Sequence, residues 1–241
     1  MLELVQIPVL TDNYVYLIHE PDSGATAVID PAVSEPVLAA LAARHWRLSH
    51  ILCTHHHGDH VGGNLDLKSA TGALVVGAAR DRARIPGLDV EVAEGDEVYI
   101  GEATAKVIET PGHTLAHICY WFTDDALLFC GDTVFSLGCG RLFEGTAHQM
   151  WDSFAKIRAL PPETRLCCAH EYTQSNARFA RTVEPDNAAL SARVAEVDRL
   201  VAQGRPTVPT TLGQELATNP FLRAADAQDF AERRRKKDHF V

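Results

Sequence analysis

The sequence contains no apolar run of the roughly 18–20 residues that a membrane-spanning helix requires. Its first residues, Met-Leu-Glu, introduce neither a basic segment nor a long apolar one, so no secretory signal peptide is expected. Both absences argue against a membrane-embedded or exported protein. They predict a cytoplasmic location.

Paired cysteine motifs are also missing. None of the six cysteines stands in a Cys-x-x-Cys pair, and the sequence has no framework of the small disulfide-stapled kind. We therefore expect free thiols in a reducing compartment, with Cys53 and Cys130 in the core because they stand in apolar runs. The six cysteines are Cys53, Cys119, Cys130, Cys139, Cys167 and Cys168.

Positive charge is scarce. The chain has 22 lysines and arginines against 32 aspartates and glutamates, a net charge of −10. An acidic surface repels nucleic acids and anionic membranes, so neither is an expected partner, and nothing implies an obligate protein partner. The basic run at residues 233–237 is an exception. It is interpreted either as a solvated helix face or as part of a binding site.

What the chain does have is an ordinary globular composition, with 46% apolar and 22% charged residues among 241. This length suits one large domain, or one domain with a small appendage. Short apolar runs bounded by Gly, Pro and Asp fill the first 172 residues, and helical patterns follow. We predict an α/β core over residues 1–172 and a helical domain over 173–241. The expected strands are 15–19, 26–30, 49–54, 74–76, 97–100, 103–108, 117–122, 126–130 and 166–169, and the expected helices are 34–45, 147–160, 188–203 and 226–237.

One short segment carries most of the chemical information. After a predicted strand the chain reads His55-His56-His57-Gly58-Asp59-His60, which contains the pattern His-x-His-x-Asp-His. In an extended loop, residues i and i+2 point to the same side, so His55 and His57 can bind one ion, and Asp59 and His60 can face a second. Imidazole and carboxylate ligands suit zinc, and also iron or manganese.

Three further candidate ligands follow predicted strands. His113 comes after a Pro-Gly turn, Asp132 follows Gly131, and His170 follows the strand expected at 166–169. Such residues are usually turn residues when they stand alone. With the first cluster present, the ends of strands in an α/β fold are where further ligands are expected.

The order of these residues resembles the metallo-β-lactamase superfamily. That resemblance covers about residues 1–172 and implies an α+β fold, an αββα sandwich with a binuclear metal site and a C-terminal helical domain. The ligands it implies are His55, His57 and His113 for one metal ion, Asp59, His60 and His170 for the other, and Asp132 as the bridge between them.

A narrower resemblance extends the comparison over nearly the whole chain. The loop at residues 139–146 is similar to the substrate loop of the glyoxalase II (hydroxyacylglutathione hydrolase) family, and so are Asn219-Pro220-Phe221-Leu222-Arg223 and the end of the chain. The resemblance implies that residues 173–241 form a substrate-binding domain that holds glutathione. The substrate-binding residues it implies are Arg141, Phe143, Tyr172, Arg234 and Lys237. Phe143 is a departure, because many relatives have Tyr there, and its hydroxyl hydrogen bond is lost.

The expected reaction is hydrolysis of S-(2-hydroxyacyl)glutathione, such as S-D-lactoylglutathione, to glutathione and D-lactate, the second step of methylglyoxal detoxification. The expected catalytic groups are Asp59 and Asp132, with a metal-bound hydroxide as the nucleophile. His56 is expected to point away from the metals, and His117 either to support a ligand or to face solvent.

Several alternatives remain open from the sequence. They are a persulfide dioxygenase with one iron, a hydrolase of other thioesters, a β-lactamase, a nuclease, a non-catalytic metal or glutathione binder, and a protein with a degenerate site. The acidic charge argues against a nuclease. The seven ligand positions argue against a closed structural site, which has four ligands per metal.

Overall fold

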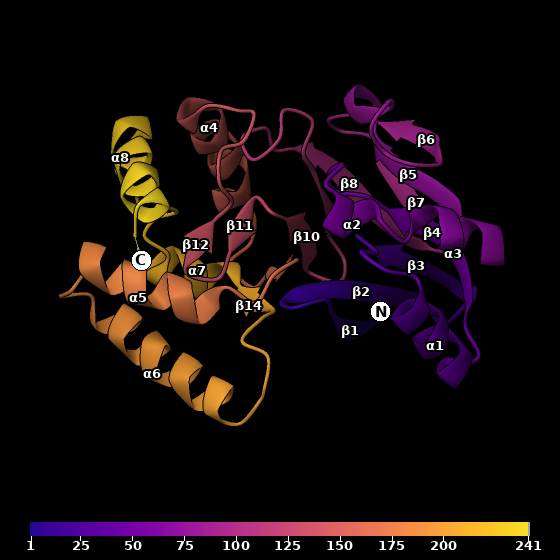
Figure 1. Cartoon of the computed structure of the whole chain (residues 1–241), viewed down its shortest axis with the longest axis horizontal. Coiled ribbons are helices and arrows are strands. Elements are labelled where there is room, and N and C mark those ends of the chain that lie inside the picture. The colour runs from indigo at the N-terminus through magenta and orange to yellow at the C-terminus, as the bar shows by residue number, and fades with distance from the viewer. Residues whose placement is uncertain (241) are drawn as a thin grey trace. The chain divides into compact units, whose positions relative to one another are not determined.

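The computed structural model describes residues 1–240, and the chain forms two compact units (Figure 1). The first unit comprises Met1–Glu109 and Ala116–Gly131, and the second comprises Thr110–Leu115 and the chain from Asp132 onward. The short segment Thr110–Leu115 therefore belongs to the second unit, although the strands before and after it belong to the first. The prediction of a boundary near residue 172 stays a prediction.

A six-stranded mixed sheet forms one layer of the first unit (Figure 1). Its order is β1-β2-β3-β4-β5-β6, with β1 to β3 antiparallel and β3 to β6 parallel. Parallel neighbours need a crossover, and helices supply two of the three crossovers here. The elements are β1 (Glu3–Val9), β2 (Asn13–Glu20), β3 (Ala25–Ile29), α1 (Glu35–Arg44), β4 (Arg47–Leu52), α2 (Gly58–Val61), α3 (Asn64–Thr71), β5 (Leu74–Ala78), η1 (Ala79–Asp81) and β6 (Leu88–Val92).

Four antiparallel strands complete the first unit, with β8 paired to β7 and β9, and β9 paired to β10. Apolar side chains of the mixed sheet pack on α1 and α3 in one core. On the other face of that sheet, the Tyr120 hydroxyl donates to the carbonyl of Cys53 at 3.1 Å, and Phe129 packs edge-on against Tyr16. The unit therefore has helices, a mixed sheet and an antiparallel sheet as successive layers. The added strands are β7 (Glu97–Ile100), β8 (Ala103–Glu109), β9 (Ile118–Phe122) and β10 (Leu127–Gly131).

The second unit is mainly helical. Phe230 packs edge-on against Phe154 and Phe221, which gives the unit an aromatic core. Side-chain caps start its helices: Thr146 forms a capping box with Gln149, and Asp226 accepts hydrogen bonds from two backbone amides. Its elements are β11 (Val134–Phe135), β12 (Gly138–Cys139), α4 (Ala147–Arg158), β13 (Arg165–Cys168), α5 (Thr173–Val183), α6 (Ala188–Ala202), β14 (Thr210–Thr211), α7 (Leu212–Thr218) and α8 (Ala227–Asp238).

Most of the predicted elements are confirmed. All nine expected strands and all four expected helices are present, and β7 has the bounds predicted for it. The prediction missed β1, α2, α3, η1, β6, β11 and β12, and in the C-terminal part α5, α7 and the two-residue strand β14. Strand β6 has the sequence Leu-Asp-Val-Glu-Val, which alternates apolar and polar residues as a strand does, so the prediction overlooked a signal that was present.

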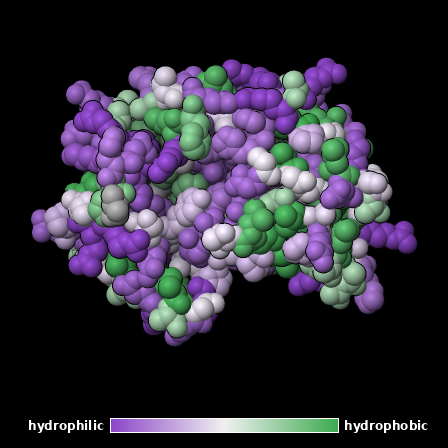
Figure 2. All heavy atoms as spheres, in the orientation of Figure 1, coloured by the Kyte–Doolittle hydropathy of each residue, from purple (hydrophilic) through white to green (hydrophobic). Residues whose placement is uncertain are grey.

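All six cysteines are free, as predicted, and all six are buried, including Cys53 and Cys130, for which burial was expected. Hydrophilic side chains predominate over α8 (Figure 2), in agreement with the run of charged residues that forms its second half. Among residues 1–240, no helix combines the length and the apolar character that a membrane span requires.

Candidate functional site

The histidine-rich loop leaves the carboxyl end of β4 in the first unit. His55 is fully buried, and its Nε2 atom lies 3.0 Å from Nδ1 of His57. The two rings meet edge to face, with centroids 4.6 Å apart. Two imidazole nitrogens therefore lie side by side, and both could bind the same cation in place of their contact with each other.

The same loop then enters the short helix α2, which carries Asp59 and His60. Nε2 of His60 lies 3.6 Å from a carboxylate oxygen of Asp59, whose side chain is partly exposed. Asn13, at the start of β2, donates to both the carbonyl and the carboxylate of Asp59, at 3.2 and 3.1 Å. This amide fixes the direction of the carboxylate.

Asp30 holds the loop in place through hydrogen bonds. It follows β3, accepts hydrogen bonds from the Thr54 amide and hydroxyl at 2.7 Å each, and lies 3.1 Å from Nδ1 of His60. Because the Thr54 hydroxyl donates to Asp30, it accepts from Nδ1 of His55 at 3.0 Å. His55 and His60, both candidate ligands, thus have Nδ1 engaged, which leaves Nε2 as the nitrogen with a lone pair.

The ring of His56 lies edge-on to that of His57, with centroids 4.9 Å apart, and the expectation that it points away from the metals stays a prediction. Its Nδ1 atom lies 2.9 Å from the buried carboxylate of Asp81, which also pairs with Arg84. His117 is buried and stacks on the His55 ring, with centroids 4.9 Å apart. His117 thus supports a candidate ligand, one of the two alternatives left open by the sequence.

Gly131 explains how His117 and Thr54 fit behind His55. Its φ is +45°, and a Cβ atom there would lie 2.3 Å from the Thr54 hydroxyl and 2.8 Å from the His117 ring. Only glycine tolerates both the left-handed backbone and this close approach.

The second unit brings together the other three candidate ligands. Asp132, which follows β10, has one carboxylate oxygen 3.4 Å from Nε2 of His113 and the other 3.4 Å from Nε2 of His170. All three side chains are buried. One carboxylate that faces two imidazoles through its two oxygens has the geometry of a bridging ligand.

His113 is oriented in the same way as the histidines of the first unit. Its Nδ1 atom donates to the carbonyl of Arg141 at 2.8 Å, so its Nε2 atom points to Asp132. Gly140 makes this contact possible, since a Cβ atom there would lie 2.0 Å from the Asp132 carbonyl and 3.0 Å from the His113 ring.

These donors fit divalent metal ions. Metal-binding histidines almost always hold their second ring nitrogen in a hydrogen bond that sets the tautomer and ring direction. His55, His60 and His113 all do so, through Thr54, Asp30 and the Arg141 carbonyl. The donor set, imidazole nitrogen with carboxylate oxygen, is that of zinc, iron or manganese sites.

A cavity of about 320 Å³ in the second unit includes two of these ligands in its wall. It has the size expected of a small-molecule site. Its lining combines metal-type ligands with aromatic rings and cations: His113, Asp132, Phe135, Cys139, Gly140, Arg141, Phe143, Tyr172, Asn176, Arg234 and Lys237.

Buried polar side chains hold the β11–β12 hairpin that forms part of this wall. Glu215 accepts hydrogen bonds from the Ser136 hydroxyl and the Leu137 amide, and Asn219 donates to the carbonyls of Phe135 and Gly138 at 3.0 Å each. Burial raises the pKa of Glu215, although these hydrogen bonds oppose the shift. The hairpin is therefore fixed by side chains from α7 and its C-cap.

The three cationic side chains that line the cavity differ in their exposure and in the number of protein groups that hold them. Arg234 is 4% exposed; it donates to the Cys139 carbonyl at 2.8 Å and pairs with Asp238 through Nε and Nη2. Arg141 is 65% exposed and lies 3.9 Å from Asp238. Arg234 is thus held on both sides by the protein, whereas Arg141 extends into solvent.

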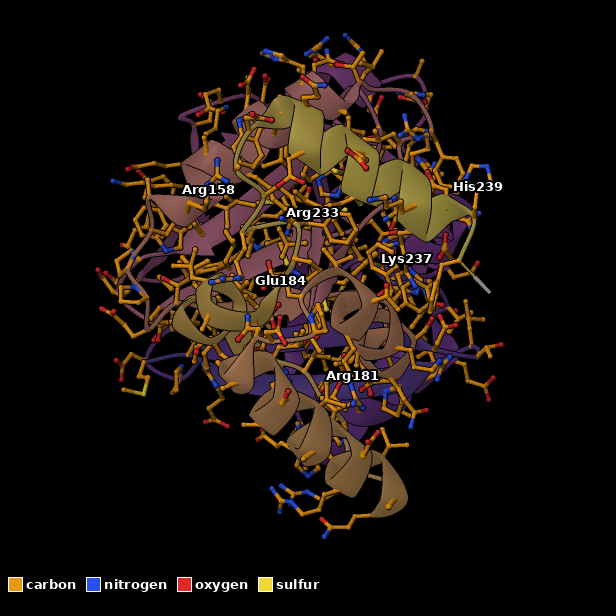
Figure 3. The ribbon with its side chains drawn as sticks, turned by 90° about the vertical axis from the view of Figure 1, so that its left-hand side faces the viewer. Arg158, Arg181, Glu184, Arg233, Lys237 and His239 are labelled. Carbon is orange, nitrogen blue, oxygen red and sulfur yellow. The ribbon has the colours of Figure 1, made fainter. Side chains whose placement is uncertain are left out.

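Lys237 is half-buried in the last turn of α8, and Figure 3 shows its position beside α5. Burial, with help from the positive charges of Arg234, Arg178 and Arg141, lowers its pKa to about 8. A cation that is partly desolvated and surrounded by other cations favours an anionic ligand.

Two aromatic rings complete the cavity. The Tyr172 ring stacks on His170 with centroids 4.7 Å apart, and the Phe143 ring meets His113 edge-on at 5.2 Å. Phe143 is 62% exposed, so its ring has open space where a hydroxyl group would otherwise extend.

Sequence analysis did not identify Asp30, Asn13 and Asp81 as residues that support the site. Each is an ordinary residue at a strand end or turn, and each acts on a loop many positions away. The one available signal was the acid at the end of a predicted strand, at Asp30, where α/β folds place functional residues.

Comparisons with known proteins agree with this geometry. Residues 9–170 match the family model of the metallo-beta-lactamase superfamily, and residues 171–240 match the model of the hydroxyacylglutathione hydrolase C-terminus. The chain is 61% identical to hydroxyacylglutathione hydrolase of Methylococcus capsulatus, covering 100% of this chain and 99% of the relative. It is 57% identical to the enzyme of the same name from Rhodospirillum rubrum, covering 99% of each.

Solved structures show the same fold. The chain resembles the crystal structure of ETHE1 from Myxococcus xanthus with a TM-score of 0.75 and 27% identity, covering 98% of this chain and 90% of that one. It also resembles a related protein crystallised in a di-iron-bound form, with a TM-score of 0.64 and 25% identity, covering 91% of this chain and 99% of that one. The predicted α+β fold of this superfamily is thereby confirmed.

Proposed function

The chain belongs to the metallo-β-lactamase superfamily and, within it, to the hydroxyacylglutathione hydrolases, and we propose how its residues carry out the reaction. It is a thioester hydrolase that converts S-(2-hydroxyacyl)glutathione to glutathione and a 2-hydroxy acid. The observation that carries our assignment of residues is the cavity of the second unit. Its wall holds His113 and Asp132 together with Arg141 and Lys237, so metal ligands and anion-binding groups share one space.

The family has a binuclear metal site, and we propose seven residues as its ligands. They are His55, His57, Asp59, His60, His113, Asp132 and His170. When bound, such ions lower the pKa of water toward neutrality and stabilise negative charge on a carbonyl oxygen. Zinc is our first choice of metal, and iron or manganese suit the same donors.

Within this scheme Asp59 and Asp132 are the catalytic carboxylates. Asn13 holds Asp59 in one direction, which suits a group that must orient a nucleophile. Asp132 presents its two oxygens to His113 and His170, which suits a group shared between two metal positions. Neither residue has to act as a strong acid, because the leaving glutathione thiol has a pKa of about 8.5 and departs readily as a thiolate.

The anionic ends of glutathione are the natural partners of the cations. Arg141 and Lys237 carry the accessible positive charge of the cavity, and we propose that they bind a substrate carboxylate. Arg234 adds its charge from a buried position and ties α8 to Cys139. Tyr172 and Phe143 flank the space between the cations and the metal ligands with their rings.

The rival activities are not favoured, because the similarity to hydroxyacylglutathione hydrolases extends over the whole chain. The acyl group we propose is D-lactoyl, which would place the enzyme in methylglyoxal detoxification. A cytoplasmic location is also our proposal, supported by six free, buried thiols that suit a reducing compartment.

The first test is hydrolysis of S-D-lactoylglutathione by the metal-loaded protein, followed as loss of thioester absorbance. We expect kcat/KM in the enzymatic range of about 10⁴–10⁸ M⁻¹s⁻¹. The Asp132→Ala variant serves as the inactive control. If the loaded protein hydrolyses a coenzyme A thioester faster than this substrate, the assignment of the cavity to glutathione is wrong.

A further inference from the structure

Lys237 reaches the cavity from the last turns of α8, and neutral groups hold its ammonium. Its Nζ atom lies 3.3 Å from the hydroxyl and 3.5 Å from the carbonyl of Ser175, near the start of α5. Among residues 1–240, no carboxylate forms an ion pair with this ammonium. Its positive charge is therefore balanced by no acid of the protein and remains available to an anionic ligand.

Two phenylalanine rings face the same ammonium from the other side. Nζ of Lys237 lies 5.6 Å from the centre of the Phe179 ring and 5.5 Å from that of Phe240. The two rings pack edge to face, with centroids 5.5 Å apart and an angle of 70° between their planes. Both distances lie within the range in which the negative face of an aromatic ring attracts a cation.

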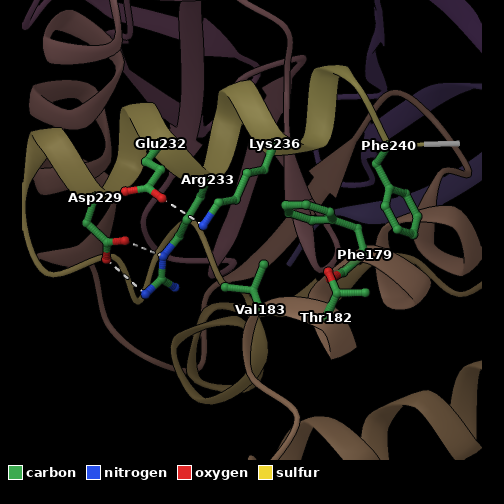
Figure 4. A pocket seen from close by; sticks show the side chains of 8 residues that line it. All are labelled: Phe179, Thr182, Val183, Asp229, Glu232, Arg233, Lys236 and Phe240. Atoms are coloured by element: carbon green, nitrogen blue, oxygen red, sulfur yellow. Dashed lines mark hydrogen bonds and ion pairs between the residues drawn. The ribbon is translucent and has the colours of Figure 1, made fainter.

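The rings belong to a different cavity from the one that contains the ligands. Phe179 and Phe240 line a space of about 350 Å³ between α5 and α8, shown in Figure 4. The charged residues of that space neutralise one another, because Arg233 pairs with Asp229 and Lys236 pairs with Glu232. Neither ring appears in the wall of the first cavity, whereas Lys237 does. A substrate there would touch Lys237 and not the rings.

This arrangement has a thermodynamic consequence for binding. A lysine side chain is long and flexible, so fixing its ammonium against a ligand costs rotamer entropy. Rings that hold the ammonium before the ligand arrives reduce that loss, because the side chain is already ordered. Phe179 is fully buried and anchored on α5, and it stacks on Phe221 of the aromatic core. The support behind Lys237 is therefore rigid.

We propose that Phe240, together with Phe179, is a positioning residue for substrate binding that acts through the ammonium of Lys237. This inference rests on the proposed function, because it takes Lys237 as a contact of the glutathione carboxylate. It concerns substrate affinity alone, since the rings lie outside the cavity in which the thioester reacts.

The test compares KM and kcat for S-D-lactoylglutathione in the wild type and in Phe240→Leu, which keeps apolar bulk and removes the ring. We expect KM to rise about threefold to tenfold, the range that corresponds to the loss of one cation–π contact, with kcat nearly unchanged. Phe240→Trp keeps an aromatic face and should restore the wild-type KM. Phe230→Leu is the matched control, because it weakens the packing of α8 without contact to Lys237.

A double-mutant cycle separates positioning from a structural role. In a Lys237→Ala background, the Phe240→Leu change should leave KM unaltered, because the group that the ring positions is gone. An equal rise of KM in both backgrounds would overturn the proposal, and so would a KM as low in Phe240→Leu as in the wild type.

Different results would contradict the proposed function of the cavity and the proposed role of the rings. If the wild-type enzyme does not hydrolyse the glutathione thioester, or if Lys237→Ala leaves KM unchanged, the proposed function of the cavity is wrong. If Lys237→Ala raises KM while Phe240→Leu does not, only the role of the rings is wrong. Direct titration of the enzymes with S-methylglutathione, which lacks a thioester, gives the same comparison without catalysis.

Discussion

The ligand loop of the first unit and the cavity wall of the second unit are held in different ways. In the loop, Thr54 and Asp30 fix the rings of His55 and His60 by hydrogen bonds, and both rings are fully buried. In the cavity wall, Arg141 and Phe143 are mostly exposed, whereas Arg234 is held by the Cys139 carbonyl and by Asp238. A metal site needs fixed donors, whereas a flexible peptide substrate needs groups that can adjust to it.

The largest expected effect comes from the carboxylate that faces two histidines. Asp132→Ala removes the group shared by His113 and His170, so we expect loss of bound metal and a fall in kcat/KM of about a thousandfold or more. Metal content and activity are measured on the same purified sample. Full activity of a metal-depleted Asp132→Ala protein would refute the two-metal mechanism.

Loss of the hydrogen bonds that Asp30 makes to the loop should weaken metal binding almost as strongly. Asp30→Ala removes the acceptor of the His60 ring and of Thr54, and changes of this kind weaken metal affinity by about tenfold to a hundredfold. Competition with a chelator measures the affinity. Asp81→Ala is the control, because Asp81 holds His56, which is not among the proposed ligands. Equal losses in both variants would show that loop stability alone is being measured.

In the cavity wall we expect an effect on substrate binding and not on chemistry. Lys237→Ala together with Arg234→Ala should raise KM far more than it lowers kcat, by about tenfold to a hundredfold for each charge-assisted hydrogen bond lost. The single variants differ, because Arg234 is buried and also holds Asp238 and Cys139. Arg234→Ala alone should lower the free energy of unfolding by about 1–3 kcal/mol, measured by denaturant titration.

The pH dependence of KM offers a smaller and independent test. Lys237 binds an anion in its protonated form, and its pKa is lowered to about 8, chiefly by burial. KM should therefore be constant below about pH 7 and rise as pH passes through the pKa, while Lys237→Ala should lack this rise. The effect of this lysine on folding stability runs the other way. Between about pH 8 and its ordinary pKa of 10.5, Lys237 is protonated in the unfolded chain and mostly neutral in the folded one, so the free energy of unfolding rises with pH.

The smallest expected change is a gain. Phe143→Tyr adds a hydroxyl to a ring that is largely exposed beside His113. One new hydrogen bond to the substrate is worth about 0.5–1.5 kcal/mol, so KM should fall by about twofold to tenfold. Phe143→Leu is the comparison that removes the ring. A Tyr variant with an unchanged KM would mean that the substrate peptide does not reach this position.

The part of the site that sequence analysis could predict is the part in which spacing is chemically restrictive. His55, His57, Asp59 and His60 stand within six residues, and few other arrangements explain so many metal-type donors together. The mixed sheet was equally accessible, because its central strands are apolar runs bounded by turns. The prediction overlooked both edge strands, β1 and β6, although β6 alternates apolar and polar residues.

The residues that support the site could not be predicted in this way. Asp30 acts on His60 from thirty positions away, and nothing in its neighbourhood marks it as more than a strand end. Arg234 and Lys237 were predicted from the family resemblance at the end of the chain, and both line the cavity. Their burial and partners differ, however, because those depend on Asp238, Cys139 and the rings of Phe179 and Phe240. Such partners are set by tertiary packing.

The segment Thr110–Leu115 limits how the two units can be separated or exchanged between homologous proteins. Because these residues belong to the second unit while β8 and β9 belong to the first, the backbone changes unit three times. A single cut or a single recombination point therefore cannot exchange one unit for a homologous one. A chimera that keeps residues 1–131 from one parent inherits His113 with that half and Asp132 with the other. The two parents must agree on this pair before any hybrid enzyme can work.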